Sequence, residues 1–492
     1  MSASPSPHPS RNLRLEATYT RLPQPFYTWL SPTPVRSPRV VLLNLQLMDE
    51  MGLPLESWKP AEVAELLSGN RLPPGVRSFA QAYAGHQFGH FTILGDGRAH
   101  VLGEWVTPSA RRLDLQLKGS GQTPYSRGGD GRAALGPMLR EYLVSEAMHA
   151  LGIPTTRSLA VVSTGEEVLR ETPLPGAILS RMASSHIRVG TFQYAALFPT
   201  SDHVGVLLDY TLQRHMPELL QAENRALAFL EAVVDRQAEL VAHWLRVGFI
   251  HGVMNSDNCA VSGETIDYGP CAFLDAYHPD QVFSSIDRGG RYAFMNQPRL
   301  TQWNLARLAE TLLPLLDPSP DGALAIATRV VESFDPLFAK RWRSMTRSKL
   351  GLAGEEADDP DLFEDLLAWM AAHQADYTNT FLALNRGEPL PDGLDSDPAF
   401  QAWKTRWEQR RARNVAPPDS TDLKMRAANP VLIPRNHKVE EALQAATRQG
   451  DLEPFLALLQ ALSRPYQDRP GIQPFQAPPR PAERVRQTFC GT

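Results

Sequence analysis

The stretch that decides the fold is His251-Gly252-Val253-Met254-Asn255-Ser256-Asp257-Asn258, and Asp267-Tyr268-Gly269 follows it nine residues later. Asparagine, serine and aspartate favour turns, so composition alone makes Asp257 a capping or turn carboxylate. The spacing gives the two segments a second interpretation, because Asn258 and Asp267 are both residues that can bind a divalent cation through oxygen.

The two segments align with the catalytic and metal-binding loops of kinase-like phosphotransferases. In those enzymes an aspartate is the base for the substrate hydroxyl, and an asparagine five positions later binds magnesium. When Asn258 is aligned with that asparagine, the base position holds Val253, which cannot accept a proton. The metal pair Asn258 and Asp267 is kept while the usual base is lost. This pattern predicts a chain that binds ATP and magnesium but uses them differently.

A glycine loop of the kind that covers phosphates lies upstream. Gly95, Gly97 and Arg98 separate two apolar segments, residues 91–93 and 101–105, which predicts a hairpin. Its glycines would let the backbone approach a phosphate closely. A plain Asp-Gly turn is the simpler interpretation of this segment alone.

Lys118 ends a predicted strand, because leucines alternate with polar residues over residues 113–118. A lysine at a strand end is often only solvated, but it can also bind phosphate. Two glycine-containing segments, residues 119–121 and 126–132, follow at once and could offer backbone N–H donors to an anion. This context favours phosphate binding.

A helix is predicted over residues 136–151, where apolar residues recur at helical spacing and Gly152-Ile153-Pro154 ends the run. Glu141 or Glu146 could form an ion pair with Lys118 and hold its ammonium near the phosphates, as the helix glutamate of kinases does. The two glutamates lie on different sides of the helix, so only one can face the cleft, and Glu141 is preferred.

Two arginines follow further predicted strands at residues 159–162 and 177–179. The guanidinium groups of Arg181 and Arg188 suit phosphate oxygens, although arginines near strand ends are commonly solvated. A long helix is predicted over residues 224–246, directly before the His251 loop. Kinase folds place a helix and then the catalytic loop in this order.

Three longer motifs carry a resemblance to a known family. They are Lys118–Arg127, His251–Asn258 and Thr265–Phe273, and Asn429–His437 and the Cys490-Gly491-Thr492 end support them. In length and order they are similar to the selenoprotein O (YdiU) family of pseudokinases, over nearly the whole chain. The resemblance implies a protein adenylyltransferase in which ATP lies in a flipped orientation and AMP passes to a Ser, Thr or Tyr hydroxyl of another protein.

The resemblance also implies roles for individual residues. Asp257 would be the proton acceptor, and Asn258 and Asp267 would bind Mg²⁺ or Mn²⁺. Lys118 and Arg181 would contact the phosphates of ATP, with UTP as an alternative nucleotide. The other residues expected at the nucleotide are Gly95, Gly97, Arg98, Asp130, Gly131, Glu141 and Arg188, together with Asp267.

The three cysteines do not form the framework of a secreted disulfide-rich protein in a chain of 492 residues. Cys271 follows the metal-binding segment, and Cys490 ends a proline-rich tail that starts at Pro465 and is predicted to be extended. The resemblance implies a redox disulfide between them that would tie the tail across the active site, with cysteine where the family can carry selenocysteine. The alternative is a buried Cys271 and an unpaired Cys490. Cys259 is predicted to pack in the core.

Composition limits the class of protein. The 492 residues are 42% hydrophobic and 21% charged, so the chain can bury a large core and is too long for one simple domain. A net charge of -5 without a basic tract argues against a nucleic-acid partner. No apolar run has the length of a membrane helix, and the first residues lack the apolar core of a secretion signal. These features predict a cytoplasmic protein.

The expected fold class is α+β, a protein-kinase-like two-lobe fold with a helical C-terminal extension. Amphipathic helices are predicted over residues 361–370, 439–446 and 455–462, and Trp403 and Trp407 are predicted to be core. The expected divisions are an N-terminal segment 1–75, a small lobe 76–180, a large lobe 181–350, a helical extension 351–464 and the tail 465–492.

Two other functions use the same residues. A protein kinase would transfer the γ-phosphate, with Asp257 in place of the missing base. A non-catalytic pseudokinase scaffold would bind nucleotide without transfer, which the retained pair Asn258 and Asp267 disfavours.

Overall fold

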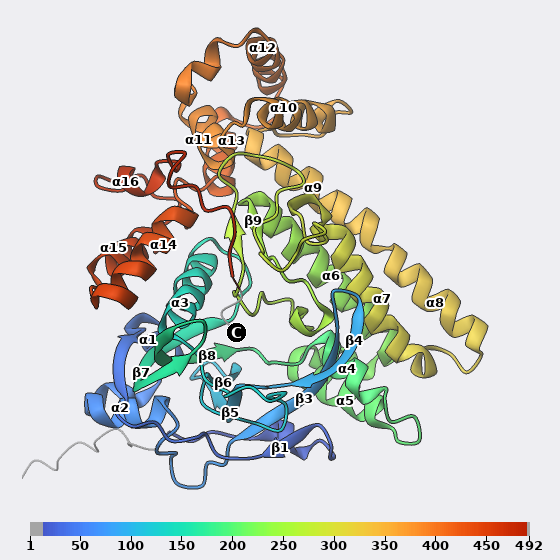
Figure 1. The fold of residues 1–492 in the computed structure, drawn as a ribbon. Coiled ribbons are helices and arrows are strands. Elements are labelled where there is room, and N and C mark those ends of the chain that lie inside the picture. Colours follow the sequence, from blue (N-terminus) through green and yellow to red (C-terminus); the bar gives the residue numbers. More distant parts are fainter. Residues whose placement is uncertain (1–12, 490–492) are drawn as a thin grey trace, which may run out of the picture.

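The computed structural model describes residues 13–489 and has a mixed α/β architecture (Figure 1). Its largest sheet has eight strands in the order β1-β3-β5-β6-β8-β7-β2, with β4 paired to β3 beside this path. The strands of this sheet pair antiparallel. Their bounds are β1 Tyr27–Trp29, β2 Arg39–Leu43, β3 Phe79–Gln87, β4 His90–Gly95, β5 Ala99–Val106, β6 Arg112–Lys118, β7 Arg157–Leu169 and β8 Pro173–Ala183.

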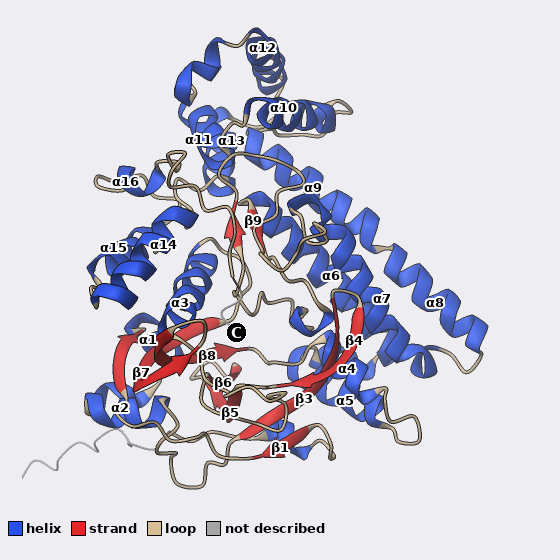
Figure 2. Ribbon diagram, in the orientation of Figure 1, coloured by secondary structure: helices blue, strands red, loops and turns tan. Residues whose placement is uncertain are grey.

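Helices surround this sheet and make up most of the chain after it (Figure 2). Two helices near the start of the chain and α3 lie against the sheet, and the others follow β8. The helices before and around the sheet are α1 Leu45–Met51, α2 Pro60–Leu67 and α3 Leu135–Ala150. The later ones are α4 Val189–Ala195, α5 His203–His215, α6 Arg225–Arg246, α7 Gln297–Leu316, α8 Pro320–Glu332, α9 Phe334–Leu350, α10 Asp359–His373, α11 Tyr377–Arg386, α12 Pro398–Ala412, α13 Pro418–Ala428, α14 Asn436–Gln444, α15 Glu453–Leu462 and α16 Gln473–Gln476.

Two short strands frame the quoted stretch. β9 (Phe249–Ile250) ends directly before His251, and β10 (Ala272–Phe273) follows the Asp267 segment and pairs antiparallel with β9. Helix α6 ends immediately before β9, as the helical periodicity predicts. The two polar loops therefore lie side by side after the C-terminal end of α6.

Helix α3 packs between the sheet and the C-terminal helices. Its Met138 and Leu139 share one apolar cluster with Val161 and Leu179 of the sheet and with Phe455 of α15. Burying a side chain such as Phe455 contributes about 2 to 3 kcal/mol. The chain after residue 435 therefore folds back and stabilises the helix that carries Glu141.

The helices predicted from periodicity are confirmed. Residues 136–151 fall on α3, 224–246 on α6, 361–370 on α10 and 455–462 on α15, while 439–446 cover α14 and the π-helical turn after it. Trp403 and Trp407 are buried and stacked. The proline-rich tail is less extended than predicted, because it includes α16.

The predicted hairpin between residues 91–93 and 101–105 is wrong. β4 pairs with β3, in register with Gly85 opposite Thr92, whereas β5 pairs with β6 and with the first residue of β3. The nine-residue strand β3 is long enough to pair with both. The glycines of the loop make room for Tyr125, since a Cβ on Gly95 would lie 2.3 Å from its ring.

The polar face of β6 is buried, although its alternating pattern predicts a strand with one solvated face. Asp114, Gln116 and Lys118 are almost fully covered. Asp114 accepts a hydrogen bond from Arg214 of α5, Gln116 donates to Asp96, and Lys118 donates to Glu141 of α3. Among residues 13–489, no helix combines the length and the apolar character needed to cross a membrane.

Candidate active site

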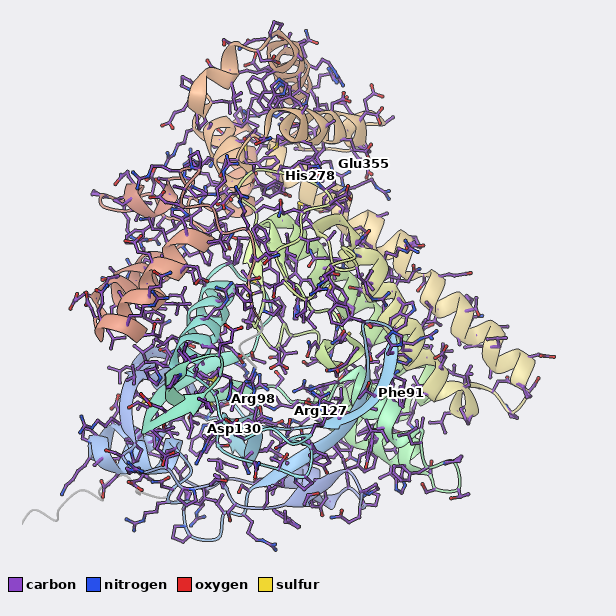
Figure 3. All side chains as sticks on the ribbon, in the orientation of Figure 1. Phe91, Arg98, Arg127, Asp130, His278 and Glu355 are labelled. Carbon is purple, nitrogen blue, oxygen red and sulfur yellow. The ribbon has the colours of Figure 1, made fainter. Side chains whose placement is uncertain are left out.

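A cavity of about 1070 Å³ opens where the sheet, the start of α3 and the loops after β9 meet. A smaller cavity of about 470 Å³ adjoins it beneath the glycine loop. Five residues line both cavities, and they are Tyr83, Gln87, Arg98, Arg127 and Asp257. Arg98, Arg127 and Asp130, which are labelled in Figure 3, all line the smaller cavity. A larger cavity of about 1250 Å³, between residues 13–16, α2 and β5, contains none of the predicted site residues.

Three cations surround the carboxylate of Asp267. Lys118 Nζ and Arg181 Nη1 each lie 2.7 Å from its Oδ1, and Arg188 Nη1 lies 3.0 Å from its Oδ2. Glu141 joins the cluster, with its carboxylate oxygens 2.6 Å from Lys118 Nζ and 3.0 Å from Arg181 Nη1. Three cations facing two carboxylates leave positive charge at the cavity, which suits phosphate oxygens.

The cluster keeps Asp267 ionised. Burial alone would raise the pKa of Asp267, but Arg181, Lys118 and Arg188 lower it well below its ordinary value. Its backbone has a φ of 63°, a left-handed conformation that aspartate tolerates better than most residues. An ionised carboxylate fixed in this way has the charge that a metal ligand requires.

Asp257 lies in a different electrostatic environment. Its side chain is buried, with the residue 6% exposed, and burial raises its pKa to about 6. Its Oδ1 has no hydrogen-bond partner among the residues that the structure describes. Arg188 instead donates to the backbone oxygen of Asp257 at 2.7 Å. A carboxylate with an available oxygen and a pKa near neutrality is suited to accept a proton.

The loop that carries Asp257 is tied to strand β3. The backbone N–H of His86 donates to Ser256 Oγ at 2.7 Å, and Ser256 Oγ donates to Gln193 Oε1 of α4 at 2.6 Å. On the other side, Tyr292 OH donates to Asn255 Oδ1 at 2.6 Å. These bonds fix the residues immediately before Asp257, so the position of its carboxylate depends on β3.

Gly85 of β3 lies directly against that carboxylate. A Cβ at this position would stand 2.4 Å from Asp257 Oδ1. Gly85→Ala is therefore expected to displace the carboxylate and to lower the transfer rate by about 10²-fold, since displacements near 1 Å have effects of this size. ATP affinity should change little, because the cation cluster stays in place. The measurements are the reaction rate and the ATP affinity of Gly85→Ala. The control is Gly289→Ala, where a Cβ meets nothing within 4 Å. Equal rates for the two variants would contradict the prediction.

Asn258 and Asp267 fit a divalent cation that binds together with phosphate. Asn258 Nδ2 donates to the backbone oxygen of Val253 at 3.0 Å, which leaves the amide oxygen for a cation. Within residues 13–489 there is no group of three or more His, Cys, Asp or Glu side chains that could hold a metal alone. Magnesium typically takes one or two protein oxygens and completes its shell with phosphate oxygens and water.

The predicted nucleotide residues divide between the two cavities. Lys118, Glu141, Arg188, Asn258 and Asp267 line the larger one. The glycine-loop residues Gly95 and Gly97 line the smaller one with Asp130 and Gly131, and Arg98 lines both. The side chain of Asp130 forms an ion pair with Arg170 at 2.8 Å.

Arg181 lies behind this surface rather than on it. Its side chain is 3% exposed and lines neither cavity. Its Nε donates to Gln116 Oε1 at 2.8 Å, and its Nη1 bonds to Glu141 and Asp267. In this arrangement Arg181 orients the two carboxylates and supplies charge from beneath them. Glu146, the alternative partner for Lys118, pairs with Arg157 instead.

Of the five residues that line both cavities, three were not predicted as site residues: Tyr83, Gln87 and Arg127. Tyr83 and Gln87 belong to β3, and the guanidinium of Arg188 lies 4.5 Å from the centre of the Tyr83 ring. Arg127 belongs to a segment expected to offer only backbone donors. Alanines at every second position over residues 80–84 are the signal that could have revealed β3.

Two of the three cysteines lie within the described residues, and both are buried without a disulfide. Cys259 packs in the core as predicted, and burial raises the pKa of its thiol to about 12. Burial likewise raises the pKa of Cys271 to about 11. Cys490 lies outside the described residues. The tail reaches the carbonyl of Pro270, next to Cys271, through the hydroxyl of Thr488.

The chain is similar to known proteins over nearly its whole length. Residues 9–463 match the family described as Protein adenylyltransferase SelO. A relative from Syntrophotalea carbinolica, named Protein nucleotidyltransferase YdiU, is 56% identical over 478 residues, which is 96% of each chain. A protein of the same name from Nitrosococcus oceani is 54% identical over 492 residues and the full length of both chains. Another from Alcanivorax borkumensis is 56% identical over 480 residues, covering 97% of this chain and 99% of its own.

These matches extend through every segment that builds the two cavities up to residue 463, and the full-length relative also covers the tail. Identity above 50% over such lengths leaves the fold and the class of enzyme in common. The chain belongs to the protein adenylyltransferase SelO family.

Proposed function

We propose that this protein transfers AMP from ATP to Ser, Thr or Tyr hydroxyls of other proteins. The observation that carries the proposal is the contrast between two aspartates that line one cavity. Asp257 has a pKa raised to about 6 by burial, whereas three cations keep Asp267 ionised. One carboxylate is therefore suited to take a proton and the other to hold charge beside phosphate.

The reaction balances with these groups. The acceptor hydroxyl gives its proton to Asp257, and its oxygen forms a bond to the α-phosphorus of ATP. The bond between the α-phosphorus and the bridging oxygen breaks, and pyrophosphate leaves. Lys118 and Arg188 neutralise the phosphates that depart, while Arg181 holds Glu141 and Asp267 in position behind them. Attack at the α-phosphorus requires the flipped nucleotide that the family resemblance implies.

A divalent cation completes the proposed site. Mg²⁺ or Mn²⁺ would be held by Asn258 and Asp267 and would neutralise charge on the phosphate oxygens as the bond breaks. Gly95, Gly97, Arg98, Asp130 and Gly131 would contact the rest of ATP from the smaller cavity. UTP would fit the same set of phosphate contacts.

The distribution of strands and helices along the chain supports a kinase-like interpretation of the fold. We propose a small lobe at 76–180 and a large lobe at 181–350, with an N-terminal segment 1–75 before them and the extension 351–464 and the tail 465–492 after them. All eight strands of the large sheet lie before residue 184, with β1 and β2 in the N-terminal segment, and long helices predominate after it. The larger cavity draws residues from both parts.

A redox link between Cys271 and Cys490 is a separate proposal. The position of Thr488 beside Pro270 supports it, because only one residue of the sequence lies between Thr488 and Cys490. The raised pKa of Cys271 should make its oxidation slow, since the thiolate is the reactive form. Peptide mapping of protein oxidised by diamide, which takes up the two electrons and two protons, should find the Cys271–Cys490 peptide pair.

The test of the proposed function uses ATP labelled at either the α- or the γ-phosphorus, with Mg²⁺ or Mn²⁺ and a reductant. Label should appear on protein from α-labelled ATP alone, and α-labelled UTP tests the alternative nucleotide. Label from γ-labelled ATP alone would show a protein kinase. ATP binding with no label from either would show a non-catalytic scaffold.

A further inference from the structure

The tail returns to the active site and is held there largely by its backbone. The N–H of Thr488 donates to Phe283 O at 2.8 Å, and the N–H of Ser285 donates to Thr488 O at 2.9 Å. Ser284 and Thr488 thus form a short parallel bridge. Thr488 is 2% exposed, and its hydroxyl donates to Pro270 O at 2.5 Å. We call this set of partners, Pro270 O, Phe283 O and Ser285 N, the tail seat.

The segment directly after the tail seat is hydrogen-bonded to the loop that carries Asp257. The carboxylate of Asp287 accepts from the backbone N–H groups of Arg291 and Tyr292, at 2.9 and 2.8 Å. Tyr292 in turn bonds to Asn255, two residues before Asp257. On its other side the seat adjoins the catalytic loop at Gly252, where a Cβ would lie 2.8 Å from Pro270 O.

The tail also enters the cavity itself. Phe489, Ser285 and Ile286 line the 1070 Å³ cavity that contains Asp257 and Asp267. In Figure 1 the tail runs from α16 past β9. A segment bound here therefore lies within the same enclosure as the proposed base and the phosphate-binding cations.

Successive side chains of an extended segment point in opposite directions. Thr488 points into the protein, whereas Phe489 is 68% exposed and faces the cavity. Phenylalanine is a tyrosine without its hydroxyl. The tail thus presents the shape of an acceptor residue but nothing that could be modified.

We propose that the tail seat is the docking site for acceptor segments of substrate proteins, and that the tail occupies it as a competitor. An acceptor would bind as an extended segment, with a small residue in the place of Thr488 and the hydroxyl residue next after it. Two of the three hydrogen bonds use the acceptor's backbone, so the site selects an extended chain rather than a particular sequence. The inference rests on the proposed function.

The acceptor probe is a synthetic peptide with the sequence from Glu483 to Phe489, carrying tyrosine in place of the last residue. The protein is the full chain with Thr488→Arg, which removes the hydroxyl and cannot fit a buried position. Gln487→Arg is the matched control, because it adds the same charge at an exposed neighbour. A reductant is present throughout, so that no disulfide contributes.

Freeing the seat should lower the KM for the peptide in Thr488→Arg by about tenfold relative to Gln487→Arg, if the tail fills the seat nine-tenths of the time. The kcat and the KM for ATP should agree between the two variants. Equal peptide KM values, or a change in the KM for ATP instead, would overturn the proposal.

A second measurement tests directly whether the residue after Thr488 occupies the acceptor position. Phe489→Tyr should become labelled on residue 489 from α-labelled ATP, as mapped by mass spectrometry, and the double variant Thr488→Arg/Phe489→Tyr should lose that label. Label that persists in the double variant, or none on residue 489 in the single variant, contradicts docking in the seat. If the wild type labels no protein or peptide from α-labelled ATP, the proposed function itself is wrong. If the wild type labels the peptide, but neither the peptide KM nor the label on residue 489 differs between the compared variants, only the docking proposal is wrong.

Discussion

Replacing Asp257 with asparagine is expected to lower the rate of AMP transfer by about 10³-fold and to leave ATP affinity nearly unchanged. Asparagine matches the shape of aspartate and fits beside Gly85, but its amide cannot take the acceptor proton. The cations that would bind phosphate do not depend on this side chain, because Arg188 contacts only the backbone oxygen of Asp257. The measurements are kcat with α-labelled ATP and the Kd for ATP by calorimetry.

The wild-type pH profile should carry the signature of the same carboxylate. Burial raises the pKa of Asp257 to about 6, and a base works only when deprotonated. The rate should therefore fall as pH drops through about 6 and should level off above pH 7. In Asp257→Asn this acidic limb should disappear from the residual activity.

One other carboxylate nearby titrates in the same range, so the variant is needed to assign the limb. Burial also raises the pKa of Asp96 to about 6. Asp96 lines neither cavity and accepts hydrogen bonds from Gln81 N at 3.0 Å and Gln116 Nε2 at 3.2 Å. An acidic limb that survives in Asp257→Asn would belong to Asp96 or another group, and Asp257 would not be the base.

The parts of the site that sequence predicts are those fixed by local pattern. The strand ending at Lys118 and the helix carrying Glu141 follow from periodicity, because burial of one face selects the residues there. Their meeting at 2.6 Å depends on tertiary packing, and it was expected only through the kinase-like order of elements. The same analogy identified the loss of a base at Val253.

The parts that sequence misses depend on what lies across the sheet or far along the chain. Arg181 was expected at the phosphates, but its direction is set by Gln116 on the neighbouring strand. Tyr83 lies in a strand of alternating small residues that is buried on both faces, so the face that lines the cavity cannot be chosen from the sequence. Thr488 meets Pro270 across 218 residues of sequence, and no local pattern contains that contact.

Asp267→Asn is expected to have the second large effect, on stability as well as on activity. The substitution removes the charge that balances three cations, of which Arg181 and Arg188 are buried. Removing one partner of a buried ion pair typically costs about 3 to 5 kcal/mol of unfolding free energy. Asp130→Asn is the matched control, because its ion pair with Arg170 is 45% exposed on the aspartate side and should contribute about 1 kcal/mol or less.

The loss of stability in Asp267→Asn should be the same at pH 5.5 and pH 7.5. The folded-state pKa of Asp267 is lowered, so its contribution is fully present above the pKa of an unfolded aspartate, about 3.9. It disappears only as pH falls toward the lowered value. Denaturant unfolding at the two pH values measures this, and a difference that shrinks between them would mean that the charge on Asp267 is not what stabilises the cluster.

The same variant also tests whether the cations are directed at phosphate. Without the Asp267 charge, Lys118, Arg181 and Arg188 are left unbalanced, and a polyanion can replace the missing carboxylate. Metal-free tripolyphosphate should therefore raise the Tm of Asp267→Asn by more than it raises the Tm of the wild type, by mass action on the folded state. With Mg²⁺ and ATP, Asp267→Asn should be less active than the wild type, because the variant has lost an anionic metal ligand. A Tm that tripolyphosphate raises equally in both proteins would mean that the cluster serves the fold and does not face the phosphates.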